Sequence, residues 1–417
     1  MQVFKFGGAS VNNVERIKKS TEILHLYKNE KTLIVISAMG KTTNELEQVV
    51  QAFYQQDREK ALLLFREIKN KHLDIAAELL QKPIPILLDF FTEVEWLLHD
   101  KPVKHFDYYY DQIVCVGELL STAIVSAYFN ESGINNLWLD VRDIFRTDNN
   151  FRDAFVNYPQ TTMNINTIVW PAFDETNLVI TQGFIGATSD NESTTLGREG
   201  SDFSAAVFAN IMDAEKIIIW KDVEGVMNAD PKKFPDAELI SELSYQEVIE
   251  MAYYGAQVIH PKTIKPLQNK QVPLFVKSFL NPNLPGTAIK KMVMKDLPPV
   301  IVIKENQVMM DLRTKDFSFV GEKNVIRLYE LFQQYKLKPN LTQNTAISFL
   351  CVMDDHSEKI EQLSLEASEL FEVSVMKDLQ LLTVRHFNEV QLNSMLLNRK
   401  ILLRQETKEV VQVLLAG

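Results

Sequence analysis

The stretch Gln2-Val-Phe-Lys-Phe-Gly-Gly-Ala-Ser10 runs from an apolar, strand-like segment through two adjacent glycines into a helical pattern between Val11 and about Tyr27. Glycine lets the backbone approach a phosphate closely, and the first turn of a helix offers N–H groups that have no partner within the helix. Lys5 would place a cation beside such a phosphate. The spacing is not that of a Walker A motif, and the two glycines alone fit an ordinary tight turn at least as well.

Short apolar runs of this kind alternate with longer helical patterns through the first two thirds of the chain. The strand candidates are Val3–Phe6, Thr32–Ser37, Asn136–Asp140, Leu178–Gln182, Lys216–Trp220 and Pro273–Lys277. Because most of them are apolar throughout, they predict an α/β fold with a mainly parallel sheet sandwiched by helices. A long helical stretch from about Asn44 to His99, broken at Pro83 and Pro85, predicts a helical lobe beside that sheet.

Capping signals predict two helix starts. Ser244-Tyr-Gln-Glu247 fits a capping box, and Gly255 would end that helix. Ser201 is a suitable N-cap for a helix over Phe203–Met212.

The pattern changes around Lys291–Pro299, and we place a domain boundary between residues 295 and 296. The elements expected beyond it are strands Val300–Lys304 and Val308–Arg313, a helix over about 322–335, strands near 337–342 and 346–353, a helix over 357–371 and a strand over 373–377. From Val308 onward this order is β-α-β-β-α-β, which predicts a ferredoxin-like α+β region. Further apolar runs lie at Leu379–Val384 and Val410–Leu415.

Composition and charge exclude several classes of protein. The 417 residues are 46% hydrophobic and 24% charged, with a formal net charge of -11 and no block of Lys and Arg, so we expect no nucleic acid or membrane as a partner. Cys115 and Cys351 lie in apolar runs, which excludes a disulfide framework and favours two buried thiols. With no apolar run near the roughly 18 residues that span a bilayer and no signal-peptide pattern, we expect a cytoplasmic protein.

Two hydroxyl-bearing residues follow the second predicted strand. The segment Leu33-Ile-Val-Ile-Ser-Ala-Met-Gly40 ends in small residues and leads into Thr42-Thr43-Asn44. Ser37 and Thr43 could donate hydrogen bonds to an anionic substrate, and the chemistry of a strand-to-helix turn explains them equally well.

A displayed arginine follows the strand predicted at Leu178–Gln182. In Thr194-Thr-Leu-Gly-Arg-Glu-Gly-Ser-Asp202, two glycines, Gly197 and Gly200, bracket Arg198 in a polar loop. The planar guanidinium group of arginine matches a carboxylate bidentately, which the ammonium group of lysine does not. A surface arginine without a ligand is the alternative.

The stretch Ile219-Trp-Lys-Asp-Val-Glu-Gly-Val-Met-Asn-Ala-Asp-Pro231 continues from a buried strand. Lys221 and Asp222 would lie at the carboxyl end of that strand, where open α/β sheets bind ligands, and a nucleotide could rest there with Lys221 or Lys232 near its phosphates. Because all four motifs follow parallel strands, we expect them to meet at one edge of one sheet. That coincidence is stronger evidence than any single motif.

Six segments together resemble a known family. They are KFGGAS from Lys5, VGELLS from Val116, TQGFIGAT from Thr181, TLGREGSD from Thr195, WKDVEGVMNADP from Trp220 and GAQVIHPKTIKP from Gly255. In this order and at this spacing they are similar to aspartate kinases of the amino-acid kinase superfamily, which carry C-terminal ACT domains. The resemblance implies an amino-acid kinase catalytic domain over residues 1–295 and an ACT-like regulatory region over residues 296–417.

The resemblance also implies roles for individual residues. The catalytic group would be Lys5, Gly7, Gly8 and Asp202. The substrate contacts would be Ser37, Thr43, Glu118, Phe184, Arg198 and Ser201. Among these, Glu118 would face an α-ammonium group and Arg198 a carboxylate. The nucleotide contacts would be Lys221, Asp222, Met227, Asp230, Lys232 and Gln257, with no metal ligand from the protein.

The reaction implied by the resemblance is the ATP-dependent phosphorylation of the side-chain carboxylate of L-aspartate to 4-phospho-L-aspartate, the first step of lysine, threonine and methionine biosynthesis. Since an aspartate side chain with a pKa of about 3.9 is already ionised at neutral pH, the reaction needs no general base. The difficulty is the repulsion between that anion and the triphosphate. We expect Mg²⁺, carried mainly on the phosphates, to reduce this repulsion.

The chain departs from the commonest pattern of the family at four positions. Lys221 and Met227 stand where Thr and Tyr are frequent, and Gln257 replaces a lysine near the phosphates, which indicates altered nucleotide contacts. Glu199 adds a negative charge beside Arg198 that could weaken substrate affinity. Two alternatives stay open. One is another amino-acid kinase of the glutamate type, and the other, which Gln257 and Glu199 favour, is a degenerate kinase that acts as an amino-acid-binding regulatory protein.

The C-terminal region resembles a pair of ACT modules. Residues 308–377 look like a fairly complete module, whereas a compressed second module would combine residues 299–307 with residues 378–417 and lack one helix. The usual glycine-leucine start of the effector-binding helix is eroded around Gly321–Arg327, which weakens the case for feedback regulation by lysine or threonine. Because ACT modules commonly pair through their sheets, we expect a homodimer.

Overall fold

The computed structural model describes residues 1–256, 259–294 and 297–416. These residues form two compact units, one containing residues 1–226, 239–249 and 259–293 and the other containing residues 227–238, 250–256, 294 and 297–416. Gln257, predicted to contact nucleotide, and the domain boundary predicted between residues 295 and 296 lie outside the described residues. The limits of the two domains therefore stay a prediction.

The first unit is built on a mainly parallel sheet, as predicted. Within the described residues its strands, in spatial order, are β3 (Leu137–Trp138), β4 (Leu178–Gln182), β2 (Thr32–Ile36), β1 (Gln2–Phe6), β7 (Lys216–Lys221), β9 (Leu274–Ser278), β10 (Thr287–Lys290) and β8 (Glu242–Ser244). Neighbouring strands are parallel except for β9 and β10, which are antiparallel. Two further strands, β5 (Ile185–Ala187) and β6 (Ser193–Thr195), form a separate antiparallel pair.

The strand predicted over Asn136–Asp140 is shorter than expected because the backbone of its first residue is bonded elsewhere. The backbone N–H of Asn136 donates to Asn130 Oδ1, and the carbonyl oxygen of Asn136 accepts a hydrogen bond from Asn130 Nδ2. The carboxylate of Asp140 accepts a hydrogen bond from the backbone N–H of Arg142 and so caps the short helix α6 (Val141–Ile144). Leu137 and Trp138 pair with β4, and the backbone N–H of Leu139 donates to the carbonyl oxygen of Ile180 at 2.9 Å.

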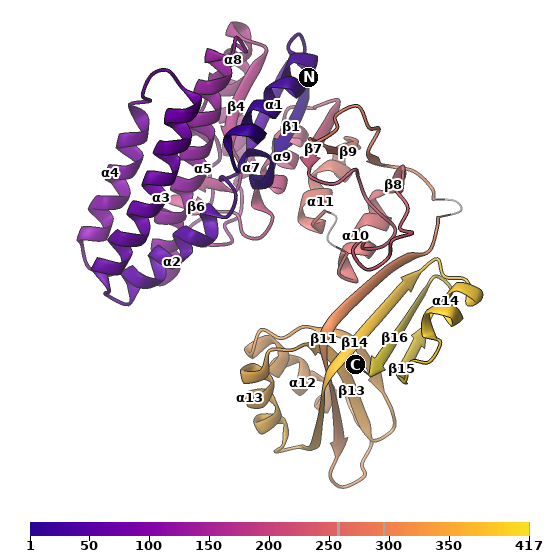
Figure 1. The fold of residues 1–417 in the computed structure, drawn as a ribbon. Helices are drawn as coiled ribbons and strands as arrows, with labels where there is room; N and C mark the ends of the chain where they lie inside the picture. Colours follow the sequence, from indigo (N-terminus) through magenta and orange to yellow (C-terminus); the bar gives the residue numbers. More distant parts are fainter. Residues whose placement is uncertain (257–258, 295–296, 417) are drawn as a thin grey trace. The chain divides into compact units, whose positions relative to one another are not determined.

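Helices surround this sheet. The α-helices are α1 (Val14–Tyr27), α2 (Thr42–Tyr54), α3 (Arg58–Leu79), α4 (Ile86–His99), α5 (Phe106–Glu131), α6 (Val141–Ile144), α7 (Tyr158–Asn164), α8 (Trp170–Glu175), α9 (Gly200–Ile211), α10 (Tyr245–Tyr253) and α11 (Pro261–Lys270). Helices α2, α3 and α4 cover the helical lobe predicted over about residues 44–99, and Figure 1 shows them beside α5. The break predicted at Pro83 and Pro85 lies between α3 and α4.

Helix α5 is long and apolar enough, by length and hydropathy, to cross a membrane, which the sequence analysis did not foresee. In the structure 83% of its most apolar window is buried. It packs against α2, α4 and the strands β3, β4 and β6, so its apolar surface belongs to the core of the first unit.

The two predicted helix starts have opposite outcomes. The Ser244 hydroxyl oxygen accepts a hydrogen bond from the backbone N–H of Glu247 at 3.0 Å, which confirms the cap at the start of α10. The prediction that Ser201 caps a helix over 203–212 is wrong, because α9 begins one residue before it, at Gly200. The chain enters α9 through a left-handed residue, Glu199, which leaves Ser201 inside the first turn.

The second unit contains an antiparallel sheet with helices α12 (Glu322–Gln334), α13 (Ser357–Ala367) and α14 (Glu389–Leu396). Within the described residues its strands, in spatial order, are β12 (Pro339–Asn344), β13 (Ser348–Asp354), β11 (Val300–Thr314), β14 (Phe371–Arg385), β16 (Val410–Ala416) and β15 (Ile401–Glu406). The chain order from β11 to β14 is β-α-β-β-α-β, and the strand order β12-β13-β11-β14 is ferredoxin-like. The predicted α+β region is therefore confirmed.

Strands β11 and β14 are longer than predicted because each runs through two modules. Residues 300–304 of β11 pair with 381–385 of β14, and residues 309–314 pair with 371–376. Between these stretches the register shifts, and Asn306 and Asp378 have positive φ angles of 53° and 57°. Such bulges bend a strand without ending it, so the chain stays in the sheet where the sequence analysis expected breaks.

The second module contains the first half of β11 and the last half of β14, which are not part of the first module. Its strand order, β11-β14-β16-β15, repeats the order β14-β11-β13-β12 of the first module. Within the described residues, α14 packs on this half of the sheet through Leu392 and Leu396, whereas α12 and α13 both pack on the first module. Among the described residues one helix packs on this half of the sheet and two pack on the other half, and the limits of the two modules stay a prediction.

The aromatic core of the parallel sheet generates a stability prediction. Trp220 on β7 is fully buried, and its ring stacks on Phe6 with centroids 6.1 Å apart and meets Phe4 edge-on at 5.7 Å. We expect Trp220→Ala to lower the free energy of unfolding by about 3–5 kcal/mol, because it removes this burial and leaves a cavity. Urea unfolding followed by far-UV circular dichroism measures the change.

The matched control is Trp96, whose side chain is 75% exposed on α4. Trp96→Ala should change the free energy of unfolding by less than about 0.5 kcal/mol. Equal effects of the two substitutions would contradict the packing described for β7.

Candidate active site

Four loops leave the parallel sheet at one edge. The strands β1, β2, β4 and β7 run in the same direction, and their registers align Phe6 with Ile36 and Trp220, and Ile36 with Gln182. The segments that follow these strands therefore begin at the same level. The structure thus brings the four sequence motifs to a common edge, where α/β sheets bind ligands.

A cavity of about 470 Å³ opens at this edge. The predicted site residues that line it are Lys5, Gly8, Ser37, Thr43, Glu118, Phe184, Arg198, Ser201 and Asp202. Other residues that line it, which the sequence analysis had not placed in the site, are Ala38, Gly40, Tyr110, Arg152, Thr195, Gly197, Glu199 and Gly200. The predicted catalytic and substrate groups therefore share one pocket, with the exception of Gly7, which lies beside it: a Cβ there would be 3.4 Å from Lys5 Nζ.

A buried ion pair lies in the pocket. Lys5 Nζ is 2.6 Å from Asp202 Oδ1, and the two side chains are 11% and 3% exposed. Lys221 Nζ, from the end of β7, is 4.0 Å from the other carboxylate oxygen. Burial alone would raise the pKa of Asp202, but the ammonium groups of Lys5 and Lys221 outweigh it and hold that pKa below its usual range. Asp202 is therefore a permanent anion that fixes the position of Lys5.

Glu118 is a second buried carboxyl group with the opposite shift. It projects from α5, and its Oε2 atom has no hydrogen-bond partner among the described residues. Burial raises the pKa of Glu118 to about 8, although the charge of Lys5 and the backbone N–H of Ala38 lower it. A buried acid with an unsatisfied oxygen on a pocket wall can accept a cationic group from a ligand.

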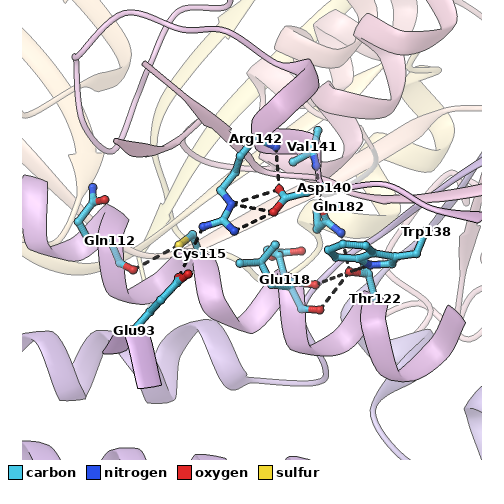
Figure 2. Close-up of polar contacts among 11 residues, drawn as sticks. Glu93, Gln112, Cys115, Glu118, Thr122, Trp138, Asp140, Val141, Arg142 and Gln182 are labelled. Atoms are coloured by element: carbon cyan, nitrogen blue, oxygen red, sulfur yellow. Dashed lines mark hydrogen bonds and ion pairs between the residues drawn. The ribbon is translucent and has the colours of Figure 1, made fainter. Parts of the chain in front are cut away.

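The position of Glu118 is fixed by polar contacts one turn further along α5, which Figure 2 shows. The Thr122 hydroxyl donates to the carbonyl oxygen of Glu118 at 2.9 Å and accepts hydrogen bonds from Trp138 Nε1 and Gln182 Nε2 at 2.9 and 2.7 Å. Ser121 donates to the carbonyl oxygen of Ser37 at 2.8 Å. These bonds attach α5 to β3, β4 and the segment after β2.

Arg198 is carried on a loop with left-handed backbone on both sides of it. Gly197 has a φ of +77°, and Glu199 has a φ of 56° at the N-cap position of α9. Positive φ is uncommon for a residue other than glycine and marks a constrained position. Because Glu199 also lines the pocket, the negative charge that the sequence places beside Arg198 lies in the same cavity.

Asp111, which was not predicted from the sequence, holds two walls of the pocket together. Its carboxylate accepts hydrogen bonds from the backbone N–H of Arg152 at 3.0 Å, the backbone N–H of Thr195 at 2.8 Å and the Thr195 hydroxyl at 2.7 Å. Burial raises the pKa of Asp111 to about 7 despite these bonds. A charged residue within an apolar helix was the available signal for Asp111, whereas nothing in the sequence distinguishes Arg152 from an ordinary loop arginine.

The described residues that were predicted to contact nucleotide do not line this cavity. Lys221 and Asp222 lie at the end of β7 in the first unit. Met227, Asp230 and Lys232 belong to the segment 227–238, which groups with the second unit, and the Asp230 carboxylate accepts the Lys232 backbone N–H in a turn. In the described part of the chain, no three His, Cys, Asp or Glu side chains gather as metal ligands.

Comparison with known proteins gives the class of the protein. The model of the amino acid kinase family matches residues 1–278, and the chain belongs to that family. Within it the chain is similar to aspartokinases. It is 30% identical over 403 residues to the chloroplastic aspartokinase 2 of Arabidopsis thaliana, covering 91% of this chain and 72% of the relative.

Solved structures give the same grouping. The crystal structure of Escherichia coli aspartokinase III in complex with aspartate and ADP has a TM-score of 0.82 and 25% sequence identity, covering all of this chain and 96% of that one. The same enzyme in complex with lysine and aspartate gives the same values. The resemblance to aspartate kinases predicted from the sequence motifs is therefore confirmed.

The close approach of two loops at the pocket generates a prediction for Gly8. A Cβ atom at this position would lie 2.6 Å from the carbonyl oxygen of Ala38 and 3.0 Å from that of Gly40. Because both atoms belong to backbone, we expect Gly8→Ala to displace the turn and to lower the free energy of unfolding by about 1–3 kcal/mol. Thermal and urea unfolding measure the change.

Gly321 provides the control, since a Cβ atom there meets nothing within 4 Å and its φ is -80°. Because Gly321 is the N-cap of α12, where alanine is less favourable than glycine, Gly321→Ala should cost less than about 1 kcal/mol. A Gly8→Ala variant as stable as Gly321→Ala would contradict the described contact between the loops.

Proposed function

We propose that this protein transfers the γ-phosphoryl group of ATP to the side-chain carboxylate of L-aspartate, producing 4-phospho-L-aspartate and ADP. The observation that carries the proposal is the single pocket that joins the Lys5–Asp202 pair, the unsatisfied carboxyl group of Glu118 and the guanidinium group of Arg198. An amino acid with a second carboxylate matches this set of charges. The similar structure of aspartokinase III holds aspartate and ADP.

The pocket suits a reaction that needs positioning and charge neutralisation. A side-chain carboxylate of the substrate is already a nucleophile at neutral pH, so an oxygen of that group can attack the γ-phosphorus directly while the bond to the bridging oxygen of ADP breaks. Lys5 supplies a fixed cation beside the transferring group, because Asp202 holds it without reorganisation. Glu118 and Arg198 would orient the substrate through its ammonium and α-carboxylate groups.

Magnesium would accompany the nucleotide. Since no cluster of ligands exists in the described part of the chain, the ion would be held mainly by phosphate oxygens and water, as Mg²⁺ commonly is. When bound, it would neutralise part of the phosphate charge. Lys221 and Asp222 lie at the adjacent strand end, where they could contact the phosphates, and the altered nucleotide contacts expected from the sequence stay a prediction.

The C-terminal unit would be the regulatory part of the enzyme. It contains two ferredoxin-like modules, and the similar aspartokinase III has been solved in complex with lysine. Lysine is therefore the first effector to test here, with threonine as the second. Pairing of two chains through this sheet, whose edges are β12 and β15, would give the expected homodimer.

Trapping of the acyl phosphate with hydroxylamine tests the activity. The full-length protein should form aspartyl hydroxamate from L-aspartate and ATP with Mg²⁺, at a rate well above that with L-glutamate, and parallel reactions with lysine or threonine test regulation. If hydroxamate forms with glutamate and none forms with aspartate, the protein is a glutamate-type kinase. Binding of aspartate and nucleotide without turnover would identify a degenerate kinase.

Lys5→Ala generates the first kinetic prediction. Removal of the cation beside the transferring phosphoryl group should lower kcat by about 10²–10³-fold, the usual effect of losing one transition-state donor. The KM for aspartate should change much less. Lys18→Ala, on the exposed face of α1, is the control and should leave both constants unchanged. An unchanged kcat for Lys5→Ala would remove Lys5 from the reaction.

The raised pKa of Glu118 generates a prediction about pH. Its value of about 8 means that the empty pocket holds a protonated carboxyl group at neutral pH. A bound ammonium group favours the ionised form, so aspartate binding below about pH 8 must release a proton. We therefore expect the KM for aspartate to fall as the pH rises from about 6 to 8.

Glu118→Gln should raise this KM and remove its pH dependence over that range, whereas Glu22→Gln, on the exposed face of α1, should behave as the wild type. Steady-state kinetics at saturating ATP and Mg²⁺ from about pH 6 to 9 provide the measurement. A wild-type KM that is constant over this range would show that Glu118 does not change its protonation state on binding.

A further inference from the structure

Arg152 lies on a loop that the structure holds firmly against the pocket. Its backbone is left-handed, with a φ of 70°, and its N–H donates to Asp111 Oδ2. Asp111 also receives both hydrogen bonds from Thr195, which lines the pocket. A strained position that several hydrogen bonds maintain is a reason to look for a function, because such conformations persist where the surroundings enforce them.

The Arg152 loop is also bound to the segment that carries Arg198. The backbone N–H of Ala154 donates to the carbonyl oxygen of Thr195 at 2.9 Å. Lys262 Nζ bridges Asp153 Oδ1 and the carbonyl oxygen of Leu196, at 2.9 and 2.8 Å. The two arginines therefore reach the pocket from one continuous wall.

The guanidinium group of Arg152 is oriented by an aromatic ring and two carboxylates. Its Cζ atom lies 4.3 Å from the centroid of the Tyr110 ring, which also lines the pocket. Nη1 is 3.2 Å from Asp107 Oδ1 on α5, and Nη2 is 3.4 Å from Glu47 Oε1 on α2, one turn after Thr43. With the Arg152 side chain 41% exposed, such ion pairs are weak and can be exchanged for another carboxylate.

The charges of the other pocket residues indicate a role for Arg152. Of the three cationic side chains that line the pocket, Lys5 is paired with Asp202, and Arg198 lies next to Glu199. The proposed substrate brings two carboxylates, one of which must stay near Lys5 to react. The α-carboxylate, at the other end of the substrate, has to be bound in a pocket that also contains Glu199, so a second guanidinium group on the same wall would offset that negative charge.

We propose that Arg152 is a substrate-binding residue that, together with Arg198, binds the α-carboxylate of the amino-acid substrate and exchanges its contact with Glu47 for that carboxylate. The inference rests on the proposed function for the identity of the substrate. The aromatic ring of Tyr110 keeps the guanidinium group at the pocket while the exchange takes place.

Comparison of L-aspartate with β-alanine tests this inference, because β-alanine keeps the ammonium group and the reacting carboxylate but lacks the α-carboxylate. We expect Arg152→Ala to weaken calorimetric binding of L-aspartate, and to raise its KM, by about 10–100-fold, the range for a lost hydrogen bond to a charged group. The affinity for β-alanine and the KM for ATP should stay within about twofold. Arg152→Lys, which keeps the charge but loses the planar fork, should fall between the wild type and Arg152→Ala.

Two further variants complete the test. Arg146→Ala is the control, because Arg146 belongs to the same loop but its guanidinium group binds Thr188 and Asn191 outside the pocket, and this variant should leave every constant unchanged. Glu47→Gln weakens the resting contact, so the KM for L-aspartate should fall by about 1.5–5-fold.

The outcomes separate this inference from the proposed function. Equal losses of affinity for L-aspartate and β-alanine in Arg152→Ala, or no loss for either, would overturn the role of Arg152. An unchanged or raised KM in Glu47→Gln would overturn the exchange. If the wild type forms no aspartyl hydroxamate, the proposed function fails, and the calorimetric comparison of the two amino acids still decides whether Arg152 binds an α-carboxylate.

Discussion

The pocket depends on the buried ion pair between Lys5 and Asp202. This pair joins the end of β1 to the first turn of α9, two elements almost 200 residues apart in sequence, at a distance of 2.6 Å. Removing two charges from water costs so much that such pairs add little net stability, while the loss of one partner leaves an uncompensated charge. The arrangement is therefore better understood as a device that keeps a cation fixed in a site where an anion has to be bound.

The two carboxyl groups of the pocket show how position sets the protonation state. Asp202 and Glu118 are both buried, and burial alone would raise the pKa of each. Two lysine ammonium groups next to Asp202 outweigh the effect of burial and lower its pKa. At Glu118 the effect of burial is larger than that of Lys5, so the pKa is raised. One acid is thus a permanent counterion, and the other is a group that a ligand can ionise. The same residue type in one cavity performs two different tasks.

The sequence was sufficient for the features that depend on local patterns. Glycine-bracketed Lys5 and Arg198 follow apolar strands, and parallel strands must present their carboxyl ends together, so their convergence could be expected. Asp111 and Arg152 could not be placed in the same way, because their importance comes from hydrogen bonds between segments that only the tertiary fold brings together. The same reason explains the continuous strands β11 and β14, where single left-handed residues replace the expected breaks.

Capping statistics misplaced the start of α9 for a related reason. Ser201 fits an N-cap by residue type, but the constrained loop that presents Arg198 decides where the helix begins. A local preference of about 1 kcal/mol is easily outweighed by the packing around a binding site.

Because the two modules share β11 and β14, the sequence of the first module is inserted within the sequence of the second. Lys304 pairs with Leu381, so the chain leaves the second module after residue 304 and re-enters it beside the same point, at residue 381. The first module lies between these two positions in the sequence. The first module is complete once β14 has been synthesised. The second module also needs β15 and β16, the last strands of the chain. Domains usually fold as units during synthesis. We therefore expect the first module to be folded before the last strands leave the ribosome, so that the second module assembles on strands that are already in place.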